Sequence, residues 1–368
     1  MEYVMLKDVC TINMGQSPDS DSYNDNGEGV PFFQGNADFG ERYPVTRKWC
    51  SAPTKIAVPE DILISVRAPI GAMNYAREKC CIGRGLAALT PDKTKVSPEF
   101  VFWLLKCKNA ELNSKGTGST FKAIGRKVLE ETKVPDIPLE KQLEYSETLE
   151  KVYAVIQHRK SELQMLDELI KARFVEMFGL PVSNTKGWQT ELMEDVAPIV
   201  NYKGKFDEEI WLLNLDMVEA QTGRILDYLI VNEDEVGNST CTFDASNVLY
   251  SKLRPYLNKV VMPDRCGYAT SELIPLQPVN TKINREYLAF MLRSDEFVNM
   301  INEKVAGAKM PRVSMGDFRK FSVPVPPIEL QNQFADFVDQ VDKSEVAVQK
   351  ALDETQLLFD SLMQQYFG

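Results

Sequence analysis

The chain has 368 residues, of which 44% are hydrophobic, and its 42 basic and 53 acidic side chains give a net charge of -11. This length is enough to bury two hydrophobic cores of ordinary size. No apolar run approaches the roughly 18 residues needed to span a bilayer, and no basic region followed by an apolar stretch opens the chain, so we expect a cytoplasmic protein without a membrane partner.

Cysteine and histidine usage argues against metal and acyl-transfer chemistry. The seven cysteines include no Cys-x-x-Cys pair and His158 is the single histidine, so neither a zinc site nor a histidine base is predicted. The chain also lacks a Gly-x-x-x-x-Gly-Lys-Ser/Thr phosphate loop. We therefore expect no catalytic residue, no metal and no cofactor.

Residues 1–138 show the pattern of a mixed globule. Short segments broken by Gly, Pro, Asn and Asp, such as Asp61–Val66 and Gly85–Leu89, predict strands. Ser97 as N-cap and Pro98 at the first helical position predict one helix that runs to about Asn113. This combination is typical of an α+β domain.

Residues 139–179 are predicted to form one long helix, because no Gly or Pro occurs before Gly179. Apolar residues recur alternately three and four positions apart, as the seam of a coiled coil requires. The seam consists of Leu149, Val152, Ile156, Leu163, Leu166 and Ile170, with Arg159, Arg173 and Met177 at the remaining positions.

The second half of the chain repeats the first. Asp8-Val9 recurs 187 residues later as Asp195-Val196, and Phe178-Gly179 recurs 189 residues later as Phe367-Gly368. The repeat is therefore a whole domain followed by a helix, and it assigns residues 180–327 to a second mixed globule and 328–368 to a second long helix.

The second helix has a matching seam. It consists of Val338, Val341, Val348, Leu352, Phe359 and Leu362, with Glu345, Thr355 and Tyr366 at the remaining positions. Each stretch is roughly 60 Å long, more than one globule needs to cover itself. We favour an antiparallel two-helix coiled coil that separates two globules related by a pseudo-two-fold axis; the alternative is that each helix packs only on its own globule.

The two seams also predict a register. If they align end to end, Leu149 faces Tyr366 and Arg173 lies beside Asp342 and Glu345. We therefore expect an interhelical salt bridge from Arg173.

Several short motifs resemble one family, the specificity (S) subunit of type I restriction-modification systems. In the first half they are Gly15-Gln-Ser-Pro18, Gly29–Gly40, Asp61–Gly71 and Ile82–Leu86, and in the second half Gly187-Trp188 ahead of Leu192–Val196. Pro138–Gln142 and Pro327–Gln331 are similar to the start of the family's conserved helices. The resemblance spans essentially the whole chain.

The resemblance implies a non-catalytic subunit with target recognition domains at 1–138 and 180–327 and conserved helices at 139–179 and 328–368. It implies double-stranded DNA and two modification (methyltransferase) subunits as partners, and it leaves open whether restriction or translocase subunits join them. Such a subunit directs an adenine methyltransferase/restriction complex to a bipartite target. The second half departs from the motifs of the first, with Leu213–Asp216 and Ser251–Tyr256 in comparable places, so the target should be asymmetric.

In each globule, the loop that follows the helix is the best candidate for DNA contact. Both loops combine cationic or hydroxyl side chains with glycines that let the backbone approach closely. The candidates in them are Lys115, Thr117, Ser119, Thr120, Lys122, Arg126, Lys309 and Arg312. Side chains that can form paired hydrogen bonds with base edges give secondary candidates: Gln34, Asn36, Arg67, Arg84, Asn214, Lys252 and Arg254. For each one alone, an ordinary surface or turn role is the alternative.

The acidic net charge is the main objection to a DNA-binding function, because phosphate contacts need Lys and Arg. The charge is unevenly placed: residues 1–138 hold 18 basic and 17 acidic side chains, whereas 328–368 hold 2 and 8. The alternatives are an S-like DNA-binding subunit of a related modification-nuclease system or regulator, and a scaffold that uses only the coiled coil.

Overall fold

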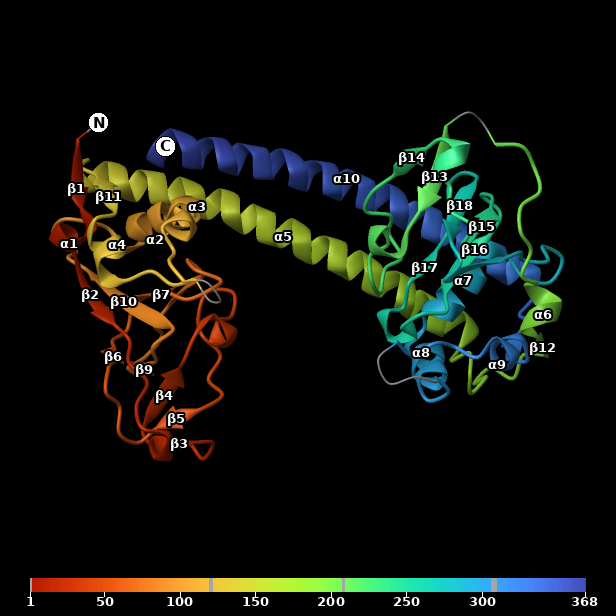
Figure 1. The fold of residues 1–368 in the computed structure, drawn as a ribbon, viewed down its shortest axis with the longest axis horizontal. Helices are drawn as coiled ribbons and strands as arrows, with labels where there is room; N and C mark the ends of the chain where they lie inside the picture. Colours follow the sequence, from red (N-terminus) through yellow and green to blue (C-terminus); the bar gives the residue numbers. More distant parts are fainter. Residues whose placement is uncertain (1, 119–121, 207–208, 306–309) are drawn as a thin grey trace. The chain divides into compact units, whose positions relative to one another are not determined.

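The computed structural model describes residues 2–118, 122–206, 209–305 and 310–368. Two compact units divide the chain, one of residues 1–160 with 350–368 and the other of residues 161–349. Each unit holds one mixed α/β globule and parts of both long helices, α5 (Leu139–Phe178) and α10 (Ile328–Phe367), which Figure 1 shows as continuous ribbons. The expected tandem α/β organisation is confirmed.

The globule of the first unit contains a four-stranded and a five-stranded sheet, in the orders β2-β10-β7-β8 and β3-β5-β4-β9-β6, and the pair β1-β11. The strands are β1 (Tyr3–Met5), β2 (Cys10–Met14), β3 (Tyr23–Asn24), β4 (Val30–Phe33), β5 (Trp49–Cys50), β6 (Ile56–Ala57), β7 (Ile62–Ser65), β8 (Met73–Tyr75), β9 (Cys80–Ile82), β10 (Leu86–Pro91) and β11 (Lys133–Pro135). The helices are α1 (Leu6–Val9), α2 (Pro98–Cys107), α3 (Asn109–Ser114) and α4 (Arg126–Glu130). Strand β7 is buried along its whole length, which explains its nearly unbroken apolar sequence.

The single helix expected from Ser97 to about Asn113 is in fact two. Ser97 caps α2 as predicted, since its hydroxyl accepts a hydrogen bond from the Phe100 amide. Lys108, however, has φ -82° and ψ 9°, outside the helical range, and α3 starts at the next residue. Neither Gly nor Pro marks this break in the sequence.

The globule of the second unit has sheets in the orders β14-β13-β18-β15 and β17-β16-β19, and the pair β12-β20. The strands are β12 (Thr190–Leu192), β13 (Ile210–Leu213), β14 (Leu229–Val231), β15 (Thr240–Phe243), β16 (Val248–Ser251), β17 (Val260–Val261), β18 (Gly267–Thr270), β19 (Leu273–Leu276) and β20 (Ser322–Pro324). The helices are α6 (Met193–Val196), α7 (Arg285–Arg293), α8 (Asp295–Asn302) and α9 (Met315–Arg319).

The internal duplication extends to strand pairing. A parallel pair, β4-β9, has its counterpart in β13-β18, and the antiparallel pair β7-β10 has its counterpart in β16-β19. The residue just before the inner strand is a buried polar one in both globules. Asp61 accepts a hydrogen bond from the Val58 amide, and Asn247 accepts one from the Asp244 amide. The two globules therefore share one backbone design.

A buried glutamine fixes the start of each long helix. The side chain of Gln142 accepts a hydrogen bond from the amide of Ser97, the N-cap of α2, and donates to the carbonyls of Lys95 and Ile137. Gln331 makes the same set of bonds, with the Asn284 amide and the carbonyls of Lys282 and Pro326. These bonds tie α5 to the N-terminus of α2, and α10 to that of α7.

In each unit the globule's main helix packs on aromatic residues of both long helices. In the first unit the ring centroid of Phe100 lies 5.1 Å from that of Phe367, and Trp103 contacts Tyr153 and Phe359 at 5.3 and 5.6 Å. Helix α2 thus contacts the first part of α5 and the last part of α10.

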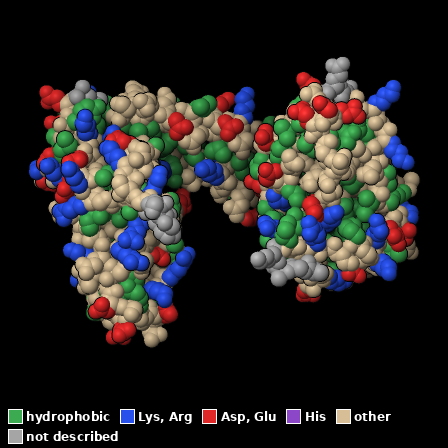
Figure 2. Space-filling view, in the orientation of Figure 1, with side chains coloured by type: hydrophobic (Ala, Val, Ile, Leu, Met, Phe, Trp, Pro, Cys, Tyr) green, Lys and Arg blue, Asp and Glu red, His purple; other side chains and the backbone are tan. Residues whose placement is uncertain are grey.

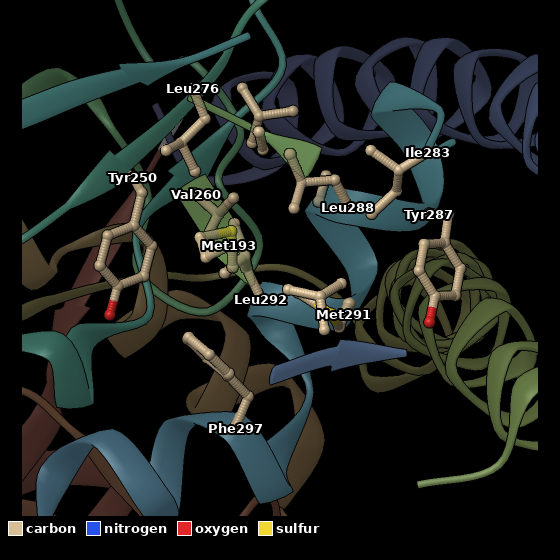
Figure 3. Packing of buried hydrophobic residues seen from close by; sticks show 14 of the residues in the cluster. Met193, Tyr250, Val260, Leu276, Ile283, Tyr287, Leu288, Met291, Leu292 and Phe297 are labelled. Carbon is tan, nitrogen blue, oxygen red and sulfur yellow. The ribbon is translucent and has the colours of Figure 1, made fainter. Parts of the chain in front are cut away.

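The second unit repeats this packing. The Tyr287 ring on α7 lies 4.7 Å from that of Phe178 and 5.5 Å from that of Phe174, and both phenylalanines also contact Phe334 on α10. Figure 3 shows Tyr287, Leu288, Met291 and Leu292 along α7 within this buried cluster. Since Tyr287 and Phe178 correspond to Phe100 and Phe367 in the duplication, the same aromatic contact occurs in both units.

The register expected from the seams is wrong by about one helical turn. Tyr366 does not face Leu149; it stacks on Tyr145, with ring centroids 3.9 Å apart. Arg173 lies over the Phe337 ring at 5.8 Å and forms its ion pair with Glu176 at 2.7 Å, while Glu345 pairs with Arg224 at 2.9 Å. Large aromatic side chains set this alignment, whereas the prediction matched only the ends of two apolar patterns.

The seam side chains all lie on inward or partly covered faces of the helices. Seven are buried: Leu149, Ile156 and Ile170 on α5, and Val338, Val341, Leu352 and Phe359 on α10. The half-buried ones are Val152, Leu163, Leu166, Val348 and Leu362. Across the described residues, no helix is long and apolar enough to cross a bilayer.

Replacing Gln331 by Leu should lower the free energy of unfolding by about 2 to 5 kcal/mol, because the Asn284 amide and the carbonyls of Lys282 and Pro326 lose their partner. Gln331 is fully buried. The matched control is Gln340→Leu, at an exposed position of the same helix. Thermal unfolding of the full chain measures both, and equal midpoints for the two variants would contradict the assignment of this role to Gln331.

The aromatic contacts predict which unit each helix end stabilises. Phe367→Ala should reduce amide-exchange protection in α2, and Phe178→Ala should reduce it in α7, each by about 3 to 5 kcal/mol. Hydrogen exchange followed by mass spectrometry resolves the two helices. Loss of protection in α7 with Phe367→Ala and none in α2 would contradict this packing.

Candidate nucleic-acid interface

In the first unit, backbone hydrogen bonds join the glycine-rich loop to the end of β7. The Ala68 amide donates to the Lys122 carbonyl at 3.0 Å, and the Ile124 amide donates to the Val66 carbonyl at 2.9 Å. Arg67 and Ala123 pair between these bonds. The loop candidates Thr117 and Lys122 therefore lie next to Arg67, and all three side chains are exposed.

A second set of backbone bonds adds Gln34 and Arg84 to the same surface. The Gly85 amide donates to the Gln34 carbonyl at 3.1 Å, and the Gly85 carbonyl accepts from Val66 at 2.9 Å. A Cβ atom at Gly85 would lie 2.4 Å from the Gln34 oxygen, so this approach requires glycine. Ser17 completes the arrangement, since its hydroxyl accepts hydrogen bonds from the Gln34 side chain and the Arg84 amide.

The second unit repeats the backbone hydrogen bonds between the loop and the strand end, and we call this set of bonds the backbone frame. The Arg254 amide donates to the Pro311 carbonyl at 2.8 Å, the Val313 amide donates to Lys252 at 2.9 Å, and Leu253 pairs with Arg312 between them. The loop candidate Arg312 is thereby brought to the candidates Lys252 and Arg254 at the end of β16. Arg254 itself has φ +50°, an uncommon conformation for a residue other than glycine.

The two frames differ in the side chains that they carry. The Lys252 amide donates a hydrogen bond to the Glu272 carbonyl, as the Val66 amide does to the Gly85 carbonyl in the first unit. Glu272 therefore occupies the place of Gly85. The Glu272 carboxylate accepts two hydrogen bonds from Arg312, at 2.7 and 3.3 Å. This contact lowers the pKa of Glu272 and raises the pKa of Arg312, so both groups are charged at neutral pH.

Several candidates take part in ordinary surface contacts. Lys115 pairs with Glu111 at 2.6 Å and thereby lowers the pKa of that carboxyl, and Arg126 pairs with Glu130 at 2.7 Å. Exposed helical pairs of this kind contribute only about 0 to 1 kcal/mol and break readily. Asn36 and Asn214 are half-buried in the short turns after β4 and β13, where their carbonyls accept backbone hydrogen bonds. Ser119, Thr120 and Lys309 lie outside the described residues.

Two residues of these surfaces were not among the sequence candidates. Ser17 lies within the Gly15–Pro18 motif, and Glu272 is the position that a shift of 187 residues aligns with Gly85. The alignment gives a location for Glu272 but no reason to select an acidic side chain on a cationic surface. Figure 2 shows Lys and Arg side chains interspersed with Asp and Glu on the visible face of each unit.

Comparison with known proteins identifies the family. The model of the type I restriction modification DNA specificity domain matches residues 1–166 and again 186–355. The chain belongs to this family. The two matches agree with the duplication and with the repeated backbone frame.

Individual relatives of this specificity-domain family resemble different parts of the chain. A putative type I restriction enzyme MjaX specificity subunit of Methanocaldococcus jannaschii is 45% identical over 160 residues, 44% of this chain and 38% of the relative. The type I restriction enzyme EcoDI specificity subunit of Escherichia coli is 23% identical over 313 residues, 74% of this chain and 70% of the relative. The match thus spans less than two thirds of the first relative's length and more than two thirds of the second relative's length.

A solved structure shares the fold over the whole length. It is the type I restriction-modification system S subunit from M. genitalium, which is 15% identical, with a TM-score of 0.60 that covers 100% of this chain and 96% of that one. At this identity the likeness shows the fold alone. Within the described residues, no group of three or more His, Cys, Asp or Glu side chains is placed to hold a metal ion.

Proposed function

We propose that this chain is the DNA specificity subunit that directs an adenine methyltransferase/restriction complex to an asymmetric bipartite target. One observation carries the proposal: the same backbone frame presents cationic side chains from a loop and a strand end in both globules. Two equivalent frames with different side chains suit two different half-sites, since direct readout depends on side chains at base edges.

The charge distribution is compatible with duplex DNA as the partner. The most acidic part of the chain is residues 328–368, with 8 acidic and 2 basic side chains, and this part contains α10. On the first globule Arg67, Arg84 and Lys122 are exposed around one loop. Local positive charge of this kind attracts phosphates even on a protein with a negative total charge.

For the long helices we propose an antiparallel coiled coil formed by the seam residues of α5 and α10. The Tyr145–Tyr366 stack in one unit and the Phe174–Phe334 contact in the other both pair an early part of one helix with a late part of the other. Residues 1–138 and 180–327 then act as target recognition domains related by a pseudo-two-fold axis. Residues 139–179 and 328–368 act as the helices on which two modification subunits assemble.

The proposed function is tested by mapping methylated adenines in the host genome with and without the gene for this chain. We expect one asymmetric, interrupted sequence to lose methylation when the chain is removed, and to regain it on complementation. An unchanged methylation pattern, or a modified sequence without a gap, would contradict the proposal. If the methylation that disappears lies at a palindromic sequence, only the proposed asymmetry of the target would be contradicted.

Lys122 provides a direct test of DNA contact. If its ammonium group neutralises one phosphate, Lys122→Ala should reduce the slope of log affinity against log salt by about 0.9 for duplex DNA. Lys151→Ala is the matched control, since Lys151 is an exposed lysine of the same unit that pairs with Glu147 on α5. Fluorescence anisotropy over a salt series measures both slopes. An equal change in the two variants would show that Lys122 contributes only to the general charge of the protein.

A further inference from the structure

The ion pair between Arg312 and Glu272 distinguishes the second recognition surface from the first. Nη2 of Arg312 lies 2.7 Å from one carboxylate oxygen and Nε lies 3.3 Å from the other. The carboxylate therefore binds one side of the guanidinium and holds the group in a fixed plane.

The remaining donors of Arg312 form a second fork. A guanidinium has five N–H groups, and Glu272 accepts from Nε and from one hydrogen of Nη2. No other acceptor for Arg312 occurs among the residues that the structure describes, so both hydrogens of Nη1 and the other hydrogen of Nη2 remain for another ligand. The Nη1 and Nη2 hydrogens at the end of the group are parallel, and this geometry matches two adjacent acceptors such as O6 and N7 of guanine or two oxygens of a phosphate.

The backbone places this fork at the recognition surface. Glu272 lies in the turn between β18 and β19, and its carbonyl accepts the Lys252 amide at 3.0 Å. Arg312 pairs with Leu253 in the backbone frame. The side chain of Glu272 is 21% exposed and that of Arg312 is 49% exposed, so the carboxylate is the more covered partner and the guanidinium is open to a ligand.

We propose that Glu272 is a positioning residue that presents Arg312 to a guanine in the half-site read by the second globule. This inference rests on the proposed function. A guanine edge is favoured over a phosphate because the negative charge of Glu272 repels a phosphate held on the same guanidinium, whereas a guanine is neutral. The first globule has Gly85 at the place of Glu272 and Ala123 at the place of Arg312, so the arrangement is specific to one half-site.

The test is selection of bound duplexes from a randomised DNA library by the full-length chain and its variants, followed by sequencing. Arg312→Ala should lose a guanine preference of roughly tenfold or more at one position of one half-site. Glu272→Ala should weaken the same preference several-fold, and Glu272→Gln should have a smaller effect because its amide oxygen still accepts one hydrogen bond. Preferences in the other half-site should not change.

The matched control is Asp264→Asn, which disrupts another exposed carboxylate–arginine pair of the same unit, Asp264 with Arg265 at 2.8 Å. It should leave every base preference intact. A purely structural role for Glu272 would weaken binding to all sequences equally and would overturn the inference. A full guanine preference in Glu272→Ala would also overturn it. A changed preference at a second position would mean that Glu272 itself reads a base. A uniform loss of affinity with a shallower salt dependence in Arg312→Ala would mean that Arg312 contacts a phosphate, and either result would overturn the inference.

The proposed function and this inference fail in different ways. If the wild-type chain enriches no sequence, the proposed function is contradicted. If the wild-type chain and Arg312→Ala behave as expected but Glu272→Ala matches wild type, the proposed function stands and only the role of Glu272 is wrong.

Discussion

The aromatic contact between the main helix of each globule and the far end of a long helix is the constraint on which the rest of the structure depends. Phe100 on α2 contacts Phe367 at the end of α10, and Tyr287 on α7 contacts Phe178 at the end of α5. All four rings are almost fully buried, and aromatic pairs of this kind add to the free energy of burying large apolar area. Neither globule completes its core with the following helix alone. The first globule also contacts the last turn of α10, and the second also contacts the last turn of α5.

The buried glutamines turn this contact into a fixed geometry. Gln142 ties the start of α5 to the N-cap of α2, while Phe367 packs on the same short helix three residues further along. Helix α2 is therefore bound at one end to the beginning of α5 and on its face to the end of α10. The same holds for α7 through Gln331 and Phe178. Within each unit, the local alignment of α5 and α10 is therefore held by contacts with the main helix of the globule.

This dependence explains which features the sequence predicts. The long helices follow from local information: no Gly or Pro, and a seam spacing typical of a packed helix. The duplication follows from dipeptide matches, and the candidates Gln34, Arg67, Arg84 and Lys122 follow from motifs that the backbone brings to one surface. The register does not follow, because it depends on aromatic contacts between residues far apart in sequence, such as Tyr145 with Tyr366 and Phe100 with Phe367. Apolar periodicity alone leaves helices free to slide by one turn, and this is the size of the error that placed Arg173 beside Asp342 and Glu345.

The break at Lys108 and the ion pair of Glu272 with Arg312 were missed for a related reason. Neither carries a local signal such as a glycine, a proline or a basic cluster, and the contacts at both places are with residues distant in sequence: Asn109 donates to the Gly71 carbonyl, and Glu272 accepts from Arg312. Glu272 also shows how two copies of one backbone can carry different side chains and ion pairs at equivalent positions. The carbonyl of Gly85 or Glu272 accepts the equivalent bond in each frame, from Val66 or Lys252, whereas only the Gly85 amide also donates to Gln34, in an approach that requires glycine. Since the bonds that join loop and strand end use only main-chain groups, side chains elsewhere in the frame can diverge while these bonds are kept, and a duplicated domain can acquire a second specificity on the first architecture.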